Sequence, residues 1–273
     1  KKLLGGPVAE WVILELSSYQ LENCNFLKLQ NSIITYLSSN HLERYKDLNE
    51  YYHFKLKITE ITKNICLFNK TSPDCVTHAP HSKSEYRLVN ADNFSHKSLL
   101  PELFLIGSHN KDNFALAAEM ATICEWPEIC FHEMTRYRGL SHRLEFVASL
   151  NGVTYINDSK ATAIDSVLVA AKGCLEGLEI PNKLFLLLGG KDKNLPWEDL
   201  SVLNSNEIVN PVFFGACGEL AREKAQLTGE YFAKLGSAIN YCQRRAQAGD
   251  VVLLSPGGTS LDEFKSFEEN QDG

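Results

Sequence analysis

The sequence lacks a positive charge balance, and this limits the partners that it can attract. Its 273 residues carry 27 Lys and Arg against 34 Asp and Glu, a formal net charge of −7. Such a surface gives no general attraction to nucleic acid or to an acidic membrane, so neither partner is expected. An anionic substrate must therefore be met by local lysines, arginines or helix N-termini.

The sequence also has no CxxC pair and no long apolar run. Its eight cysteines lie mostly in apolar stretches such as "NICLFN" and "ATICEW", which is typical of buried, reduced thiols in a cytosolic protein. No apolar stretch approaches the ~20 residues of a membrane-spanning helix. The start, "KKLLGGPVAEW", is too short in its apolar part for a signal peptide. We therefore expect a cytoplasmic protein without membrane insertion. Because the first residue is not Met, we also expect a piece of a longer chain.

The composition that is present is that of a globular protein with two domains. Hydrophobic residues make up 44% and charged residues 22% of a chain long enough for two cores. The sequence pattern changes around "YRGLSH", after which predicted strands and helices alternate. This change places the boundary between domains 1–137 and 138–273. In the first domain, apolar runs and helical periodicity predict strands and helices, with loops and short edge strands over 71–100. The predicted strands are 11–16, 32–37 and 64–69, and the predicted helices are 48–62 and 114–124.

The second domain alternates strands and helices. Its all-apolar strands run from "LEFVASL" through "VTYIND", "KLFLLLGG" and "PVFFGA" to "GDVVLLSPGG". This alternation predicts an α/β fold with a mostly parallel sheet covered on both faces. Ligands of such sheets bind at the carboxyl ends of the strands, so the residues that follow each strand are the candidates for function.

Polar residues follow one of these strands in "YINDSKATAIDS" (155–166). Asp158 and Lys160 stand between the strand and a helix that begins near Thr162. In one interpretation they meet a nucleotide, because Lys160 suits a phosphate and Asp158 can accept hydrogen bonds from a ribose. In the other, Asp158 or Ser159 caps the helix and Lys160 is solvated.

Two further clusters carry candidate ligands in the first domain. Glu15 lies inside an apolar predicted strand, where a carboxylate is costly unless it is paired or bound to a metal. Together with His41, at the end of the next strand, it predicts a magnesium site. Lys55 follows on the helix, where a solvated lysine is the commoner outcome. Asn110 and Asn113 precede the predicted helix 114–124 and are interpreted either as nucleobase contacts or as an N-cap.

Seven segments in order resemble the Mur ligases, and among them the branch that adds D-glutamate. The resemblance extends over nearly the whole chain. The segments are "LELSSYQLE", "SSNHLERY" with "YYHFKLKI", "GSHNKDNFALAA", "GLSHRLE", "INDSKAT", "LLLGGKDK" and "LLSPGGTSLDEFKSFE".

The resemblance implies an ATP-dependent amide-bond ligase of peptidoglycan synthesis, and thereby a role in cell-wall biogenesis, cell shape and cell division. It implies part of a central ATPase-type α/β domain, followed by a Rossmann-like domain that binds the amino acid. The implied cofactors are ATP and Mg²⁺, and the implied substrates are UDP-N-acetylmuramoyl-L-alanine and D-glutamate, joined through an acyl phosphate. The expected oligomeric state is a monomer.

The resemblance also implies residue roles. Glu15, His41 and a carbamylated Lys55 match metal ligands, and Lys55, His41 and Lys160 match catalytic residues. Asn110 and Asn113 match adenine contacts, Arg143 a phosphate contact and Asp158 the ribose contact. The implied D-glutamate pocket consists of Thr162, Lys193, Ser260, Leu261 and Phe267.

The sequence departs from the family pattern in its ATP loop. No GxxGK[ST] motif occurs, and the segment before residue 11 does not match the family's usual one. The expectation is a fragment without the UDP-binding domain and the ATP loop, and therefore a chain that is inactive by itself. Two alternatives stay open: a sister ligase of the Mur or folylpolyglutamate type that adds another amino acid, and a non-catalytic nucleotide-binding remnant.

Overall fold

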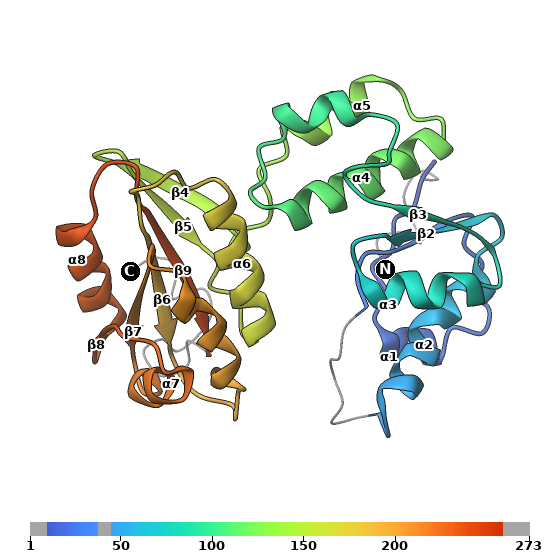
Figure 1. Cartoon of the computed structure of the whole chain (residues 1–273). Helices are drawn as coiled ribbons and strands as arrows, with labels where there is room; N and C mark the ends of the chain where they lie inside the picture. The colour runs from blue at the N-terminus through green and yellow to red at the C-terminus, as the bar shows by residue number, and fades with distance from the viewer. Residues whose placement is uncertain (1–9, 38–44, 259–273) are drawn as a thin grey trace, which may run out of the picture. The chain divides into compact units, whose positions relative to one another are not determined.

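The computed structural model describes residues 10–37 and 45–258 of the chain (Figure 1). The chain divides into two compact units, one of residues 1–97 and 115–126 and the other of residues 98–114 and 127–273. Residues 98–114 and 127–137, which the sequence analysis assigns to the first domain, therefore lie in the second unit. The boundary between domains 1–137 and 138–273 stays a prediction. Within the described ranges, none of the helices combines the length and the apolar character that a membrane crossing requires.

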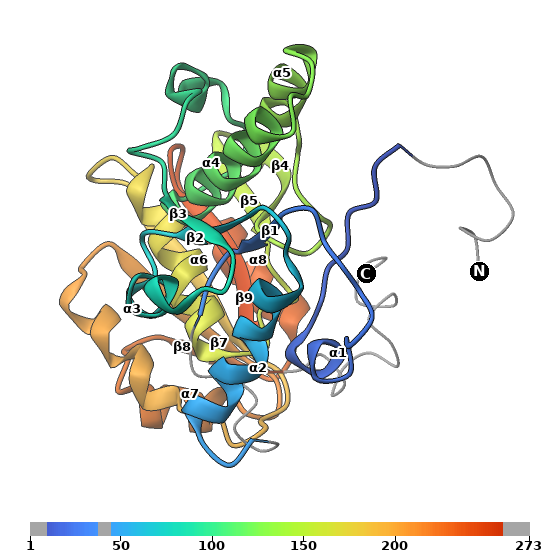
Figure 2. The same cartoon turned by 90° about the vertical axis from the view of Figure 1, so that its right-hand side faces the viewer.

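The first unit contains a parallel sheet in the order β1-β2-β3, whose strands are all labelled in Figure 2. Its central strand is buried at every residue, as a strand between two covered faces must be. One face packs against α2 and α3, where Ile34 and Phe68 of the sheet join Tyr51 and Tyr52 of α2 and Cys75 of α3 in one buried cluster. The elements of this unit are α1 (Ser18–Glu22), β1 (Ser32–Ile34), α2 (Leu48–Ile61), β2 (Ile65–Asn69), α3 (Pro73–His78), η2 (Ala79–His81) and β3 (Glu85–Val89).

Two helical segments cross between the units: η3 (Lys97–Glu102) and the long helix α4 (Ser108–Ile123). The later part of α4 belongs to the first unit, where Glu119 pairs with Arg87 of β3. The first turns of α4 belong to the second unit, where Gly107 approaches Gly173 closely. The helix therefore contributes to both compact units.

The second unit is built on a six-stranded sheet in the order β4-β5-β9-β6-β7-β8. All neighbouring strands are parallel except β4 and β5, which form an antiparallel hairpin. Its elements are α5 (Ile129–Thr135), β4 (Glu145–Leu150), β5 (Val153–Asn157), α6 (Ile164–Glu176), β6 (Leu184–Gly189), η4 (Trp197–Ser205), β7 (Val209–Phe214), α7 (Gly218–Ala225), β8 (Glu230–Phe232), α8 (Leu235–Arg245) and β9 (Val251–Gly257).

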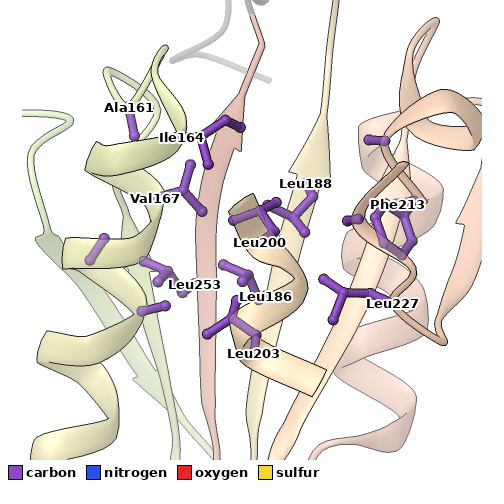
Figure 3. Close-up of a cluster of buried hydrophobic side chains, with 14 of the residues drawn as sticks. Ala161, Ile164, Val167, Leu186, Leu188, Leu200, Leu203, Phe213, Leu227 and Leu253 are labelled. Carbon is purple, nitrogen blue, oxygen red and sulfur yellow. The ribbon is translucent and has the colours of Figure 1, made fainter. Parts of the chain in front are cut away.

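Helices cover both faces of this sheet, because its central strands are apolar on both sides. On one face α6, α7 and η4 bury a cluster that includes Val167, Leu186 and Leu253, and Figure 3 shows these side chains pointing toward one another. On the other face α8 packs over Phe185 and Leu187. Alternate residues of β6 thus pack into the two hydrophobic cores on opposite faces of the sheet.

The structure confirms most of the predicted elements and corrects several. Residues 11–17 form no strand, and most apolar side chains of this segment are exposed, Ile13 to 82%. A strand needs hydrogen-bonding neighbours, and no described strand pairs with this segment. Within the predicted loop region 71–100 the structure has α3, η2, β3 and part of η3, and α4 begins six residues earlier than predicted.

Candidate functional site

Five parallel strands of the second unit end at one edge of the sheet, and the loops that follow them are joined there. The backbone N–H of Gly257, at the end of β9, donates to the carbonyl of Ala161 after β5, at 2.9 Å. The next residue, Gly258, donates to the carbonyl of Gly189 at the end of β6, at 3.2 Å. The residues after β5, β9 and β6 therefore form one continuous surface, as the sequence pattern predicts.

Asp158 is buried at this edge, with 7% of its surface exposed. Its Oδ1 accepts from the backbone N–H of Leu144 at 3.1 Å, and its Oδ2 accepts from the hydroxyl of Ser255 at 2.9 Å. Burial raises the pKa of this carboxyl to about 6, although both hydrogen bonds and the nearby Arg143 act to lower it. Asp158 therefore has a raised pKa and joins three segments of the site.

The loop that carries Arg143 is fixed on both sides. His142 and Leu144 have positive φ angles of 67° and 45°, a left-handed conformation that costs a non-glycine residue roughly 1–2 kcal/mol. Asn157 Nδ2 lies 2.9 Å from Nδ1 of His142, and the backbone N–H of His142 donates to Glu145 Oε2 at 2.8 Å. These contacts hold the loop while the Arg143 side chain itself stays exposed.

Lys160 and Thr162 lie between β5 and α6. The N-cap of α6 is Ala163, which makes no side-chain capping bond. The interpretation of Asp158 or Ser159 as a helix cap is therefore wrong, because the Asp158 carboxylate is bound to Ser255 and Leu144 instead. Lys160 is exposed, next to the uncapped, positively polarised N-terminus of α6.

Lys193 lies in the turn after β6, beside a second lysine, Lys191. Both side chains are exposed, and Asp192 between them is half-buried. The turn begins with Gly189, whose backbone approaches Phe214 so closely that a Cβ would lie 1.9 Å from the Phe214 carbonyl oxygen. Only glycine fits this approach, which sets the path of the chain toward the two lysines.

Asn110 and Asn113 lie within the first turns of α4, which starts at Ser108, so neither is an N-cap. The side-chain amide of Asn110 donates to the carbonyl of Ile106 at 2.8 Å, which leaves its Oδ1 as an acceptor. Asn113 is exposed. Both asparagines belong to the second unit, together with Asp158 and Arg143.

Lys55 lies on α2 in the first unit. Burial lowers its pKa from the ordinary value, although the nearby Cys75 thiol acts in the opposite direction. Its Nζ lies 5.5 Å from the centre of the Tyr51 ring. Lys55 is thus half-buried beside an aromatic side chain, and the interpretation of a fully solvated helix lysine is wrong.

Two of the three predicted metal ligands, Glu15 and Lys55, lie among the described residues, and the magnesium site stays a prediction. Glu15 is exposed in an irregular segment, so the argument from a buried carboxylate is wrong. His41 lies outside the described residues, as do Ser260, Leu261 and Phe267 of the predicted D-glutamate pocket. In the part of the chain that is described, no three metal-ligating side chains form a group.

Sequence reasoning missed several residues that hold the edge together. Ser255 and Asp192 both stand inside quoted motifs, "LLSPGG" and "GGKDK", but neither was given a role. His142 and Asn157 likewise flank predicted residues. Their position next to predicted site residues could have indicated a role in the site. Their contacts could not be predicted, because these depend on segments far apart in the sequence.

Comparison with known families covers both parts of the chain. Residues 7–100 match the Mur ligase middle domain, and residues 142–258 match the Mur ligase glutamate ligase domain. The chain belongs to the Mur ligase family. This family membership was expected from the seven ordered motifs of the sequence.

Two curated relatives of this Mur ligase chain carry the same enzyme name. The UDP-N-acetylmuramoylalanine–D-glutamate ligase of Haemophilus influenzae is 34% identical over 277 residues, which cover 95% of this chain and 62% of the relative. The ligase of the same name from Pasteurella multocida is 33% identical over 279 residues, again with 95% and 62% covered. The chain therefore spans less than two thirds of the length of these relatives.

Solved structures show the same fold. The MurF ligase from Thermotoga maritima in complex with ADP has a TM-score of 0.64 at 14% identity, covering 91% of this chain and 62% of that one. FolC from E. coli, in complex with DHPP and ADP, has a TM-score of 0.62 at 15% identity, covering 89% and 62%. These likenesses establish the α/β architecture.

Proposed function

We propose that this chain is part of an ATP-dependent ligase that adds D-glutamate to UDP-N-acetylmuramoyl-L-alanine in peptidoglycan synthesis. The observation that carries the proposal is the joined edge of the parallel sheet. It brings the loops of Arg143, Asp158 and Lys193 into one hydrogen-bonded surface. The identity of the chain to D-glutamate ligases supports the choice of amino acid.

The nucleotide is assigned to the side of the edge formed by the loops around Arg143 and Asp158. A carboxylate offers about four acceptor sites. Two sites of Asp158 are occupied by Leu144 and Ser255, so two remain for ribose hydroxyls. Arg143 and Lys160, both exposed, supply positive charge for phosphate oxygens. Asn110, whose Oδ1 is left as an acceptor, and the exposed Asn113 are assigned to adenine.

The amino acid is assigned to the side of the edge formed by the turn after β6. Lys193 pairs with a carboxylate of D-glutamate, and Thr162 offers a hydroxyl and a backbone N–H nearby in the loop after β5. The remaining predicted contacts, Ser260, Leu261 and Phe267, follow β9 in the sequence. A cationic pocket of this kind selects an amino acid that carries an extra carboxylate.

Magnesium and the carbamate of Lys55 belong to the proposal through the family resemblance. A bound Mg²⁺ would neutralise charge on the phosphates during transfer to the substrate carboxylate. Glu15, His41 and the carbamylated Lys55 would hold it. Of these, only Lys55 has described surroundings that favour its role, because a lowered amine pKa promotes reaction with carbon dioxide.

In the proposed reaction, the γ-phosphoryl group of ATP is transferred to the substrate carboxylate and ADP is released. The amine of D-glutamate then attacks the acyl carbon, loses a proton and displaces inorganic phosphate. In this scheme Arg143 and Lys160 hold the phosphate oxygens, and their charge stabilises the transferred group. Lys193 fixes the carboxylate of D-glutamate so that its amine faces the acyl carbon. The attack then proceeds as an effectively unimolecular step between groups that are already oriented.

The test is an assay of the complete protein for ADP release and amide formation. We expect turnover only when ATP, Mg²⁺, UDP-N-acetylmuramoyl-L-alanine and D-glutamate are all present. Turnover with another amino acid or with a folate substrate would favour a sister ligase. Nucleotide binding without turnover would favour the non-catalytic alternative.

A cytoplasmic location and a monomeric state complete the proposal. All eight cysteines are free thiols, and five of them are buried, which suits a reducing compartment. Sedimentation of the complete protein at several concentrations tests the monomeric state, and fractionation of the source cells tests the location.

A further inference from the structure

Asp192 occupies the centre of the turn between β6 and η4, directly between Lys191 and Lys193. Its Oδ1 accepts from the indole Nε1 of Trp197 at 2.9 Å and from the backbone N–H of Leu195 at 3.2 Å. The backbone N–H groups of Lys193 and Asn194 also act to lower the pKa of this carboxyl. The Asp192 side chain therefore joins the backbone of the turn to the first residue of η4.

This arrangement fixes a turn that is otherwise irregular. Asn194 has a positive φ of 58°, which an isolated chain adopts only at some cost. The two hydrogen bonds to the Asp192 carboxylate compensate for this conformation, since a charge-assisted bond is stronger than a neutral one. The backbone of Lys193 is thereby held in one conformation, while its side chain stays exposed.

Trp197 connects the same turn to the end of β9. Its side chain is fully buried, with 0% of its surface exposed. A Cβ placed on Gly257 would lie 3.0 Å from the Trp197 ring, so the indole packs directly on the last residue of that strand. Asp192 fixes the direction of the indole through Nε1. The turn after β6 is therefore connected to the end of β9 by the hydrogen bond between Asp192 and Trp197 and by the contact of the Trp197 ring with Gly257.

We propose that Asp192 is a positioning residue, which holds the turn that presents Lys193 to the carboxylate of the incoming amino acid. Through Trp197 it also holds that turn against the end of β9. The inference rests on the proposed function and adds a residue to which no role was assigned.

The electrostatics of Asp192 agree with this role. Burial acts to raise the pKa of its carboxyl, but the hydrogen bonds from Trp197 and from the backbone outweigh it, so the pKa lies below the ordinary value. The carboxylate is therefore charged at neutral pH and keeps all its acceptor sites. A lysine side chain has many rotamers, so fixing its backbone removes part of the entropy cost of binding.

The experiment compares Asp192→Ala, Asp192→Asn and Trp197→Phe in the complete protein. We expect Asp192→Ala to raise the KM for D-glutamate by about tenfold or more and to change the KM for ATP by less than about twofold. Asp192→Asn keeps an acceptor oxygen and should recover much of the loss. Trp197→Phe keeps the aromatic ring but removes the donor, and should show an intermediate effect. Asp199→Ala, which removes an exposed carboxylate of η4, is the matched control.

A spectroscopic readout separates positioning from general damage. In a background where every other tryptophan of the complete protein, Trp11 and Trp126 among them, is replaced by Phe, the emission of Trp197 should shift to longer wavelength in Asp192→Ala. A parallel rise of both KM values together with a loss of cooperative melting would indicate mere structural damage and would overturn the inference. If Asp192→Ala does not fold, Asp192→Asn and Trp197→Phe carry the test, and an unchanged KM for D-glutamate in both overturns it.

Lys193→Ala, measured in the same assay, distinguishes a failure of the proposed amino-acid site from a failure of the positioning role of Asp192. If Lys193→Ala leaves the KM for D-glutamate unchanged, the proposed site of the amino acid is wrong. If Lys193→Ala raises that KM but a folded Asp192→Ala does not, the proposed function stands and the positioning role of Asp192 is wrong.

Discussion

The hydroxyl of Ser255 donates a 2.9 Å hydrogen bond to Oδ2 of Asp158, across 97 residues of sequence. Both side chains are buried, Ser255 to 0% exposure. The bond joins the ends of two neighbouring parallel strands, β5 and β9, at the edge where the candidate site lies. Ser255 therefore controls how readily Asp158 carries its charge.

Nucleotide affinity should depend on pH through Asp158. Its pKa of about 6 implies that affinity falls as pH drops through 6, because a protonated carboxyl loses acceptor sites for ribose. Ser255→Ala removes a hydrogen bond that lowers this pKa. The fall in nucleotide affinity at acid pH (the acid limb) should therefore begin at a higher pH. Binding of ATP to the complete protein, measured by calorimetry from pH 5 to 8, tests this. The exposed Ser201→Ala is the control, and an unmoved limb in Ser255→Ala would contradict the assignment.

The same group predicts the sign of a stability change. The folded-state pKa of about 6 exceeds the ordinary value of 3.8, so the folded state binds the extra proton between these limits. The contribution of Asp158 to the free energy of unfolding must therefore decrease as pH rises through this window. Asp158→Asn should weaken this dependence in urea titrations at pH 4 and pH 7. An equal dependence in both proteins would show that other groups cause it.

Lys55→Ala should abolish turnover of the complete protein if the carbamate is required. Short carboxylic acids should restore part of the activity, because they supply the oxygens that the carbamate would have contributed. The lowered pKa of the amine supports its reaction with carbon dioxide. Lys63→Ala, which removes an exposed lysine just after α2, should remain active. Full activity of Lys55→Ala would refute the assignment.

Lys193→Ala should raise the KM for D-glutamate far more than that for ATP. A charge-assisted bond to a carboxylate contributes roughly 1.5–3 kcal/mol, which corresponds to a rise of about ten- to hundredfold. Lys183 lies just before β6, at the opposite end of the same strand, so Lys183→Ala is a matched control. Initial rates at varied D-glutamate, with ATP saturating, provide the measurement.

Gly189→Ala should destabilise the second unit strongly. Its Cβ would lie 1.9 Å from the carbonyl oxygen of Phe214, so β6 and β7 must separate locally. The cost should be on the order of 3 kcal/mol, seen as a lower midpoint of thermal unfolding. At Gly236, in the first turn of α8, a Cβ meets nothing within 4 Å, so Gly236→Ala should be neutral or slightly stabilising. Equal midpoints for both variants would show that the β6 turn adapts without cost.

Apolar runs and helical periodicity were sufficient to predict helices and strands whose own residues are mostly apolar on the buried side. Helix α2 and strand β2 lie almost where periodicity and apolar runs place them, and so do β5, β6 and β9. The segment 11–16 has the same apolar character, yet it forms no strand among the described residues. Strand formation depends on a hydrogen-bonding neighbour, which composition cannot specify.

The motifs by themselves determined the family and which residue types are chemically active, because chemistry needs particular side chains at particular spacings. The order of strands and helices likewise followed from apolar patterning. Only the tertiary structure decided that Asp158 is held by Ser255 and Leu144 rather than capping a helix. It alone showed that Asp192 accepts hydrogen bonds from Leu195 and Trp197, and that Trp197 packs against Gly257. The physical reason is that hydrogen bonds and pKa values depend on burial and on neighbours from distant segments, which meet only when the parallel strands align their ends.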